Sequence, residues 1–437
     1  MRSTLILIIV LTVLAAVVGG VRYYVLPTYY PHLLKQTSSD QTADQAAAQA
    51  SPTPEPLAES SIATVSAQLL QSLTPRQKVA QLLALPVVVP ANSDQIASTA
   101  GELSGEVPGF ATLFGQRISA LQADQMTSAI KRIPTEPDML ASQPNLSELE
   151  RKLLEPLVAV DHEGGTVQRL SGEGMTAFPS AQEQCGMDRE SFKSVLDRAA
   201  KELHGVGIDI VFGPVLDLGA NHPILRTRLC SDNPDVVRNY GLFWIEAMQA
   251  QHVIPVLKHY PGIGQSTVDL HTRADTIAFN PVEHSVFLGL LNTYPHVGVM
   301  TTHVSLLSED GSSAKLCTTS PECLGHLNLS APHLIFTDGL EMASAQGQFA
   351  SGSATTTKQT LSELSALAIE AGHNVIVLGK TVPVAETDKI ITDLADRYQR
   401  NPVFKQQVDR ALQVIWQAKF DHWNAMGELS VSSQKPL

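Results

Sequence analysis

The chain has 437 residues, of which 43% are hydrophobic, and its formal net charge is −13 at pH 7. This length accommodates one large domain or two or three ordinary ones, and the hydrophobic content allows a sizeable core without metals or disulfides. Because a strongly acidic chain repels phosphate backbones, we expect no nucleic-acid partner.

The N-terminus contains an apolar run, Leu5–Val18, which follows Arg2 and is extended by Gly19–Val21. A run of roughly 17 residues is at the lower limit for a helix that spans a bilayer. Because no convincing A-x-A-like cleavage site follows, residues 1–30 are predicted to be an uncleaved signal anchor, with a cleaved signal peptide as the alternative. We therefore expect an extracytoplasmic protein that is anchored in the membrane, or secreted if the segment is cleaved.

Composition divides the rest of the chain into three parts. Residues 31–60 are rich in Ala, Gln, Ser, Asp and Pro, which predicts a disordered linker. Residues 61–425 carry the apolar patterns of a folded domain, and residues 426–437 are predicted to be a flexible tail.

Eight short apolar runs recur along the folded part. They are mostly rich in β-branched residues and continuous rather than alternating, as expected of strands buried on both faces of a parallel sheet. The runs are Leu83–Val89, Gly109–Phe114, Leu157–Val160, Ile208–Leu216, Val253–Leu257, Val297–Thr301, His333–Thr337 and Val375–Leu378.

Helical patterns separate these runs. Apolar residues at helical spacing between Phe192 and Leu203 predict one helix, which Gly205–Gly207 ends, and a second pattern runs from Val236 to Met248. Eight strands alternating with helices over roughly 300 residues favour a (β/α)₈ TIM-type barrel. An open dinucleotide-binding sheet is disfavoured because no G-x-G-x-x-G follows an early strand.

Five of the predicted strands end in ionisable residues. In a barrel the carboxyl ends of the strands converge on one pocket, so we expect these residues to gather there, although each alone could be a solvated loop residue. They are Asp161, Asp217, Lys258 with His259, His303 and Asp338.

The four cysteines, Cys185, Cys230, Cys317 and Cys323, form no C-x-x-C pair and no metal-finger spacing. Only Cys317 and Cys323 are close in sequence, where a small loop disulfide and two free thiols fit equally well.

Several segments together resemble glycoside hydrolase family 3, and within it the single-domain bacterial β-N-acetylhexosaminidases. The segments occur in the family's order over about Leu73–Leu378. They are DHEGGTVQR at Asp161–Arg169, FGPVLD at Phe212–Asp217, Arg228 ahead of Asp232–Pro234, KHYPGIG at Lys258–Gly264, Asp269–His271, VMTTHV at Val299–Val304 and IFTDGLEM at Ile335–Met342.

The resemblance implies catalytic roles for three residues. Asp338 matches the carboxylate that attacks the anomeric carbon, although an isolated Thr-Asp-Gly is also typical of a helix N-cap. Asp269 and His271 match an Asp-x-His pair that supplies the general acid and base. Histidine titrates near neutral pH, and alternation in an extended loop would place both side chains on one side.

The resemblance also implies a sugar-binding set, whose charged groups suit hydroxyls that both donate and accept hydrogen bonds. This set is Asp161, Arg169, Arg228, Lys258 and His259. The alternatives are a helix cap for Asp161 and surface ion pairs for the arginines. Asp217 is interpreted as structural, anchoring loops through hydrogen bonds.

Three positions depart from the family's pattern. Thr166 stands where the family usually has Arg, Ile263 where it has His, and Gly339 where it has a second Asp. None is a proposed catalytic residue, but Ile263 could alter how the acid–base loop closes.

These features predict a retaining exo-β-N-acetylglucosaminidase that acts on peptidoglycan fragments or chito-oligosaccharides and needs no cofactor or metal. Release of the sugar to phosphate and another β-glycosidase activity of the same family stay open.

A second hypothesis, motivated by the three departures, is a catalytically weak, membrane-tethered sugar-binding protein. A third, a metal-dependent barrel hydrolase, lacks an H-x-H strand or an H-E-x-x-H helix.

Overall fold

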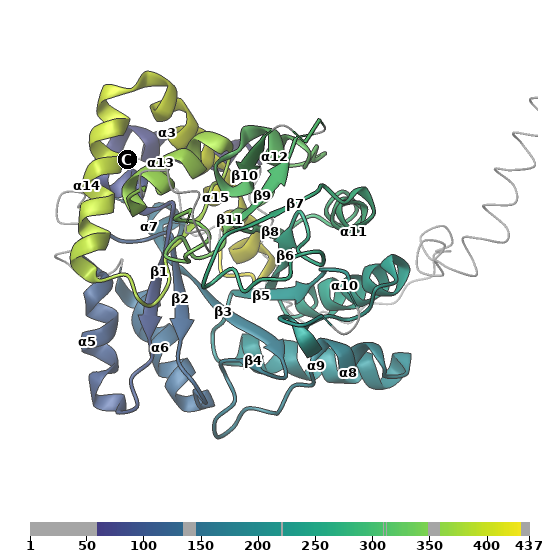
Figure 1. The fold of residues 1–437 in the computed structure, drawn as a ribbon. Helices are drawn as coiled ribbons and strands as arrows, with labels where there is room; N and C mark the ends of the chain where they lie inside the picture. Colours follow the sequence, from purple (N-terminus) through teal and green to yellow (C-terminus); the bar gives the residue numbers. More distant parts are fainter. Residues whose placement is uncertain are drawn as a thin grey trace, which may run out of the picture. The chain divides into compact units, whose positions relative to one another are not determined.

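The computed structural model describes residues 59–133, 146–219, 222–308, 310–311, 313–347 and 359–429. These residues lie within one compact unit, Glu55–Leu437 (Figure 1). The predicted anchor at residues 1–30 lies outside the described residues, as does all of the linker except its last two positions. Within the described residues, no helix has the length and apolar character needed to cross a membrane.

The predicted (β/α)₈ barrel is confirmed, with a strand at each of the eight apolar runs. In the described part of the chain the parallel path runs β11-β8-β6-β5-β3-β2-β1-β12. A parallel bridge between Phe336 and Val375 joins the two ends of this path and closes the barrel. The strands are β1 (Leu83–Val88), β2 (Phe110–Phe114), β3 (Leu157–Gly164), β5 (Ile210–Val215), β6 (Ile254–Tyr260), β8 (Gly298–Thr301), β11 (Ile335–Thr337) and β12 (Ile376–Val377).

Continuous apolar sequence makes these strands because both of their faces are covered. Every residue of β5, β6 and β8 is buried. Inside the barrel, the ring of Phe336 lies edge-on to Phe110 at 5.7 Å and to Phe212 at 5.5 Å between centroids. The interior is therefore a packed core, and space for a ligand is left only beyond the strand ends.

Helices cover the outside of the barrel (Figure 1). The two predicted helical patterns correspond to α9 and α10, although Val236 is 38% exposed and the neighbouring Val237 is buried in its place. The α-helices are α3 (Glu59–Ser72), α4 (Pro75–Ala80), α5 (Ile96–Gly101), α6 (Ala120–Arg132), α7 (Glu148–Leu154), α8 (Ala181–Cys185), α9 (Arg189–Gly205), α10 (Pro234–Gln249), α11 (Pro281–Leu291), α12 (Pro321–Gly325), α13 (Leu361–Ala371), α14 (Val384–Arg400) and α15 (Pro402–Ala425).

Short strands that the sequence did not predict organise the loops beyond the barrel. The two-residue β4 (Val167–Gln168) pairs antiparallel with the end of β3. A second sheet contains β7 (Asp275–Ile277), β9 (Val304–Leu307) and β10 (Ala314–Leu316). The pairing of β7 with β9 fastens the loop after β6 to the loop after β8.

All four cysteines are in disulfides. Cys317 is bonded to Cys323, so the free-thiol alternative is wrong for this pair. Cys185 at the end of α8 is bonded to Cys230, a link that sequence analysis did not predict because 45 positions separate the two. This second bridge ties α8 to the loop that carries Arg228.

Candidate active site

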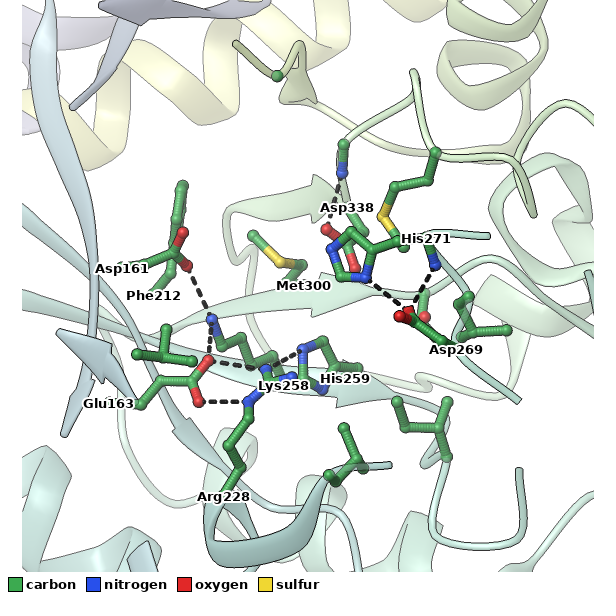
Figure 2. A pocket seen from close by; sticks show the side chains of 18 of the residues that line it. Asp161, Glu163, Phe212, Arg228, Lys258, His259, Asp269, His271, Met300 and Asp338 are labelled. Carbon is green, nitrogen blue, oxygen red and sulfur yellow. Dashed lines mark hydrogen bonds and ion pairs between the residues drawn. The ribbon is translucent and has the colours of Figure 1, made fainter. Parts of the chain in front are cut away.

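A cavity of about 200 Å³ opens at the carboxyl ends of the strands (Figure 2). All eight residues that sequence analysis predicted for the site line it, so the convergence expected of a barrel is observed. These residues are Asp161, Arg169, Arg228, Lys258, His259, Asp269, His271 and Asp338.

One wall of the cavity is a cluster of charged side chains from β3, β6 and the loop after β5. The Lys258 Nζ atom lies 3.0 Å from Asp161 Oδ1 and 2.7 Å from Glu163 Oε1. Arg228 pairs with both oxygens of Glu163, through Nε at 2.8 Å and Nη2 at 2.9 Å. Arg169 adds a longer contact of 3.4 Å to Asp161. The alternative for the two arginines was ion pairing on the protein surface. They do form ion pairs, but these lie in the wall of the cavity.

Because these charged side chains are buried, each of them depends on a neighbour of opposite charge. Burial alone would raise the pKa of Glu163, but the charges of Arg228 and Lys258 outweigh it and hold that pKa far below its usual range. For Lys258, burial would lower the pKa, yet Asp161 and Glu163 raise it above its ordinary value. Both groups are therefore charged at neutral pH, and the wall presents fixed charges to a ligand.

Glu163 is a site residue that sequence analysis did not single out. It stands two positions after Asp161 in β3, whose pairing continues to Gly164. Because side chains alternate along a strand, Asp161 and Glu163 face the same side. That alternation was the available signal.

His259 is oriented by Asp217. The ring Nδ1 lies 2.6 Å from Asp217 Oδ2, so Nδ1 carries a proton that it donates to this oxygen. The other ring nitrogen, Nε2, faces Arg228 and lies 3.4 Å from its Nη2. The other carboxylate oxygen of Asp217 accepts hydrogen bonds from the backbone N–H groups of His259 and Ile263. The interpretation of Asp217 as a loop anchor is confirmed, and it also fixes the direction of a cavity side chain.

Glu283 holds the same loops from behind. Its Oε1 accepts hydrogen bonds from the backbone of Leu218 at 2.7 Å and of Gly264 at 3.1 Å. Burial, together with the neighbouring Asp217 carboxylate, raises the pKa of Glu283 to about 8. A protonated Glu283 therefore joins the loops after β5 and β6 without adding a second negative charge beside Asp217.

Asp338 follows β11 and projects toward the cavity (Figure 2). Its backbone N–H donates to the carbonyl of Thr301, and its Oδ1 accepts a hydrogen bond from Gly339 N at 2.8 Å. Turns and not a helix follow in residues 339–347, so the N-cap alternative is wrong for this residue.

His303 supports Asp338 from below the cavity. Its Nε2 lies 3.0 Å from the carbonyl oxygen of Gly339 and therefore donates a hydrogen bond to it. Burial alone would raise the pKa of Asp338, but the nearby imidazoles of His303, His259 and His271 outweigh burial and lower it. Asp338 is consequently an ionised carboxylate. His303 itself does not line the cavity, and neither does Asp217.

Asp269 and His271 form the predicted pair. His271 Nδ1 lies 3.0 Å from Asp269 Oδ1, which also accepts a hydrogen bond from the backbone N–H of His271 at 3.0 Å. The loop is a tight turn, so the expectation of an extended loop is wrong. Burial would raise the pKa of Asp269, but these hydrogen bonds and the His271 charge lower it. The two side chains are 46% and 71% exposed, respectively.

The loop that carries this pair is fastened to the loop after β11. The carbonyl of His271 accepts a hydrogen bond from Ala343 N, and that of Leu270 accepts one from Ser344 N. The Leu270 side chain joins a small apolar cluster with Ile263 and Met342. Ile263, one of the departures from the family's pattern, thus contributes apolar packing to the cluster that includes Leu270 of the Asp269–His271 turn.

The arrangement offers no metal centre in the residues that the structure describes. No group of three or more His, Cys, Asp and Glu side chains there is placed to hold an ion.

The fold and the cavity together define an enzyme-type (β/α)₈ barrel, with ionisable side chains at the carboxyl ends of its strands. Residues 76–418 match the sequence profile of the glycosyl hydrolase family 3 N terminal domain. The chain therefore belongs to glycoside hydrolase family 3.

Individual relatives agree with this assignment. The chain is 26% identical over 337 residues to a protein named beta-hexosaminidase A from Pseudoalteromonas piscicida. The aligned region covers 71% of this chain and 53% of that protein. A beta-hexosaminidase from Xylella fastidiosa is 33% identical over 174 residues, covering 37% of this chain and 50% of the relative. The chain thus spans about half the length of these curated relatives.

Solved structures share the fold. The crystal structure of a β-N-acetylhexosaminidase from Beutenbergia cavernae superimposes with a TM-score of 0.63 at 22% identity, covering 79% of this chain and 98% of that chain. A family 3 β-N-acetylglucosaminidase from Paenibacillus sp. strain FPU-7 gives a TM-score of 0.65 at 21% identity, covering 83% of this chain and 64% of that chain.

The raised pKa of Glu283 predicts a pH-dependent stability. An unfolded glutamate releases its proton near pH ~4.3, whereas folded Glu283 holds it to about pH 8. Between these values the folded state binds more protons, so this group makes the free energy of unfolding fall as the pH rises. Glu283→Gln keeps an acceptor oxygen for Leu218 and Gly264 but cannot ionise.

Urea unfolding between pH 5 and about pH 8 measures this effect. We expect the variant to lose less stability than the wild type across this range, with a difference on the order of 2 kcal/mol or more at the upper end. Equal pH slopes for the two proteins would contradict the assignment.

Proposed function

We propose that the protein is a retaining exo-β-N-acetylglucosaminidase that removes terminal N-acetylglucosamine from peptidoglycan fragments or chito-oligosaccharides. The observation that carries this proposal is the meeting of an ionised Asp338 carboxylate and the Asp269–His271 pair in one cavity. The names of the relatives, beta-hexosaminidase and β-N-acetylglucosaminidase, support the choice of an N-acetylated amino sugar.

In the first step, Asp338 attacks the anomeric carbon and forms a glycosyl ester, while the bond to the leaving oxygen breaks. His271 gives its proton to that oxygen. Because Nδ1 faces Asp269, the proton comes from Nε2. Asp269 stabilises the imidazolium form and holds the ring in position.

In the second step, water replaces the leaving group. His271, now neutral, takes a proton from the water as its oxygen attacks the anomeric carbon, and the ester bond to Asp338 breaks. Two inversions give net retention of configuration. The exposure of the Asp269–His271 turn suits this task, since the leaving group and the water must both reach it from solvent.

The charged wall is proposed to hold the non-reducing-end sugar. Asp161, Arg169, Arg228, Lys258 and His259 provide donors and acceptors for its hydroxyls. Their ion pairs with one another and with Glu163 and Asp217 fix their positions before the ligand arrives, so little ordering is required on binding.

We also propose that the enzyme works outside the cytoplasm, tethered by its N-terminal apolar segment. Two disulfides support an oxidising compartment, because cytosolic proteins of mesophiles rarely keep such bonds. Membrane fractionation of cells that express the full chain, or one that lacks residues 1–30, tests this proposal. Full-length protein in the membrane fraction is expected, and full-length protein in the cytoplasmic fraction would contradict it.

The activity is tested with a chromogenic N-acetylglucosaminide. We expect Asp338→Ala to reduce kcat on the order of a thousandfold or more, because the nucleophile is lost. His271→Ala should cost about 10²–10⁴-fold, the usual contribution of a positioned proton donor. Asp235→Asn and His326→Ala change exposed residues outside the cavity and serve as matched controls.

Full activity in Asp338→Ala would refute the mechanism. Wild-type protein that binds the sugar tightly without turnover would favour the sugar-binding protein over the enzyme. Comparison of rates with and without inorganic phosphate separates hydrolysis, which phosphate leaves unchanged, from phosphorolysis.

A further inference from the structure

Glu341 is a carboxyl group of the cavity to which neither the mechanism nor the sugar-binding set gives a role. It lies in the turn after β11, three positions beyond Asp338, and lines the same cavity. Its Oε2 accepts a hydrogen bond from the backbone N–H of Gly379 at 2.8 Å. Because Gly379 follows β12, the carboxyl group lies between the ends of the last two strands of the barrel.

Two glycines make room for this carboxyl group. A Cβ atom on Gly379 would lie 1.5 Å from Glu341 Oε1, and one on Gly339 would lie 2.9 Å from Oε2. A side chain at residue 379 would displace the carboxyl group, and one at residue 339 would crowd it. The two glycines therefore leave a space between the ends of β11 and β12, and the Glu341 carboxyl group fills it.

The surroundings of Glu341 differ from those of the other cavity carboxylates. Asp161 and Glu163 are paired with Lys258, and Glu163 also with Arg228. Within the described residues, Glu341 makes no ion pair and no hydrogen bond to another side chain; its side-chain partner is the backbone N–H of Gly379. The lining residues of β12 and of the turn after it, Val377 and Gly379, are uncharged.

The pKa of Glu341 is shifted in the opposite direction from that of its neighbour Asp338. Burial raises the pKa of Glu341 and the Asp338 carboxylate raises it further, while backbone hydrogen bonds and the His271 charge only partly oppose this rise. The pKa of Asp338 is shifted downward. Neighbouring carboxyl groups whose pKa values are pushed apart commonly divide their work.

We propose that Glu341 is a further substrate-binding residue, whose carboxyl group forms a hydrogen bond with a hydroxyl group of the sugar bound over Asp338. This inference rests on the proposed glycosidase function. Among the described lining residues at the ends of β11 and β12, Asp338 and Glu341 are the ionisable ones. With Asp338 assigned to the anomeric carbon, Glu341 is the group at these strand ends that can bind a hydroxyl group of the sugar.

Two substitutions of matched length test the proposal. Glu341→Gln retains an oxygen for Gly379 and an N–H group that can donate to the sugar, whereas Glu341→Met fills the space without any donor. Gln346→Ala is the control for the loop, because Gln346 Nε2 donates to the backbone carbonyl of Glu341. Thermal unfolding shows whether each variant is folded.

The readouts are kcat and KM for the chromogenic N-acetylglucosaminide and the Kd of free N-acetylglucosamine by calorimetry. We expect Glu341→Met to raise KM and Kd about tenfold while kcat stays within about twofold, the pattern of a lost binding contact. Gln346→Ala should stay within about twofold of the wild type, and Glu341→Gln, which keeps hydrogen-bonding groups, should raise KM and Kd less than Glu341→Met does.

An unchanged Kd in Glu341→Met would overturn the proposal. So would an equal loss in Glu341→Gln, which keeps both a hydrogen-bond donor and an acceptor, or an equal loss in Gln346→Ala, which would indicate displacement of the loop. If Glu341→Met does not fold, Glu341→Asp, which withdraws the carboxyl group by one methylene, should raise Kd in its place. If the proposed glycosidase function itself is wrong, the wild-type protein binds the sugar without turning it over. This outcome differs from failure of the Glu341 proposal, in which the wild type is active and Glu341→Met binds the sugar equally well.

Discussion

The common direction of the barrel strands is the constraint on which the site depends. Parallel strands in a closed barrel bring all their carboxyl ends to one rim, so residues far apart in the sequence reach a single cavity. Asp161 comes from the third strand and Asp338 from the seventh. The loops beyond the rim are then fastened to each other, by β7 pairing with β9 and by the hydrogen bonds of Ala343 and Ser344 to the Asp269–His271 turn.

Charge balance is the second requirement. Glu163 and Lys258 are almost completely buried, and each is stable as an ion only because the other is present together with Arg228 and Asp161. Removal of one member of such a cluster leaves an uncompensated buried charge, a change that commonly costs about 3–5 kcal/mol. Around it, carboxyl groups of the same chemical type differ in charge state. Asp338 is ionised, whereas Glu283 is protonated at neutral pH.

Sequence analysis identified the barrel because all eight strands are continuous apolar runs, a pattern that depends only on burial of both faces. It identified the eight predicted cavity residues because each matches a family motif. It did not single out Glu163 or Glu341, whose importance arises from neighbours on other strands. Nor did it predict the Cys185–Cys230 disulfide or the turn at Asp269–His271, which depend on contacts between loops. Ile263 and Gly339 departed from the family's pattern. The structure places Ile263 in the apolar cluster with Leu270 of the Asp269–His271 turn, and Gly339 against the Glu341 carboxyl group.

In the proposed mechanism Asp338 bonds covalently to the sugar. Incubation with a fluorinated N-acetylglucosaminide, which slows release of the glycosyl ester, followed by peptide mass spectrometry, would trap and locate this bond. We expect a single added sugar on the peptide that contains Asp338, and no such label in Asp338→Ala. A label on another carboxylate of the cavity, or steady turnover of the substrate without any labelled protein, would contradict it.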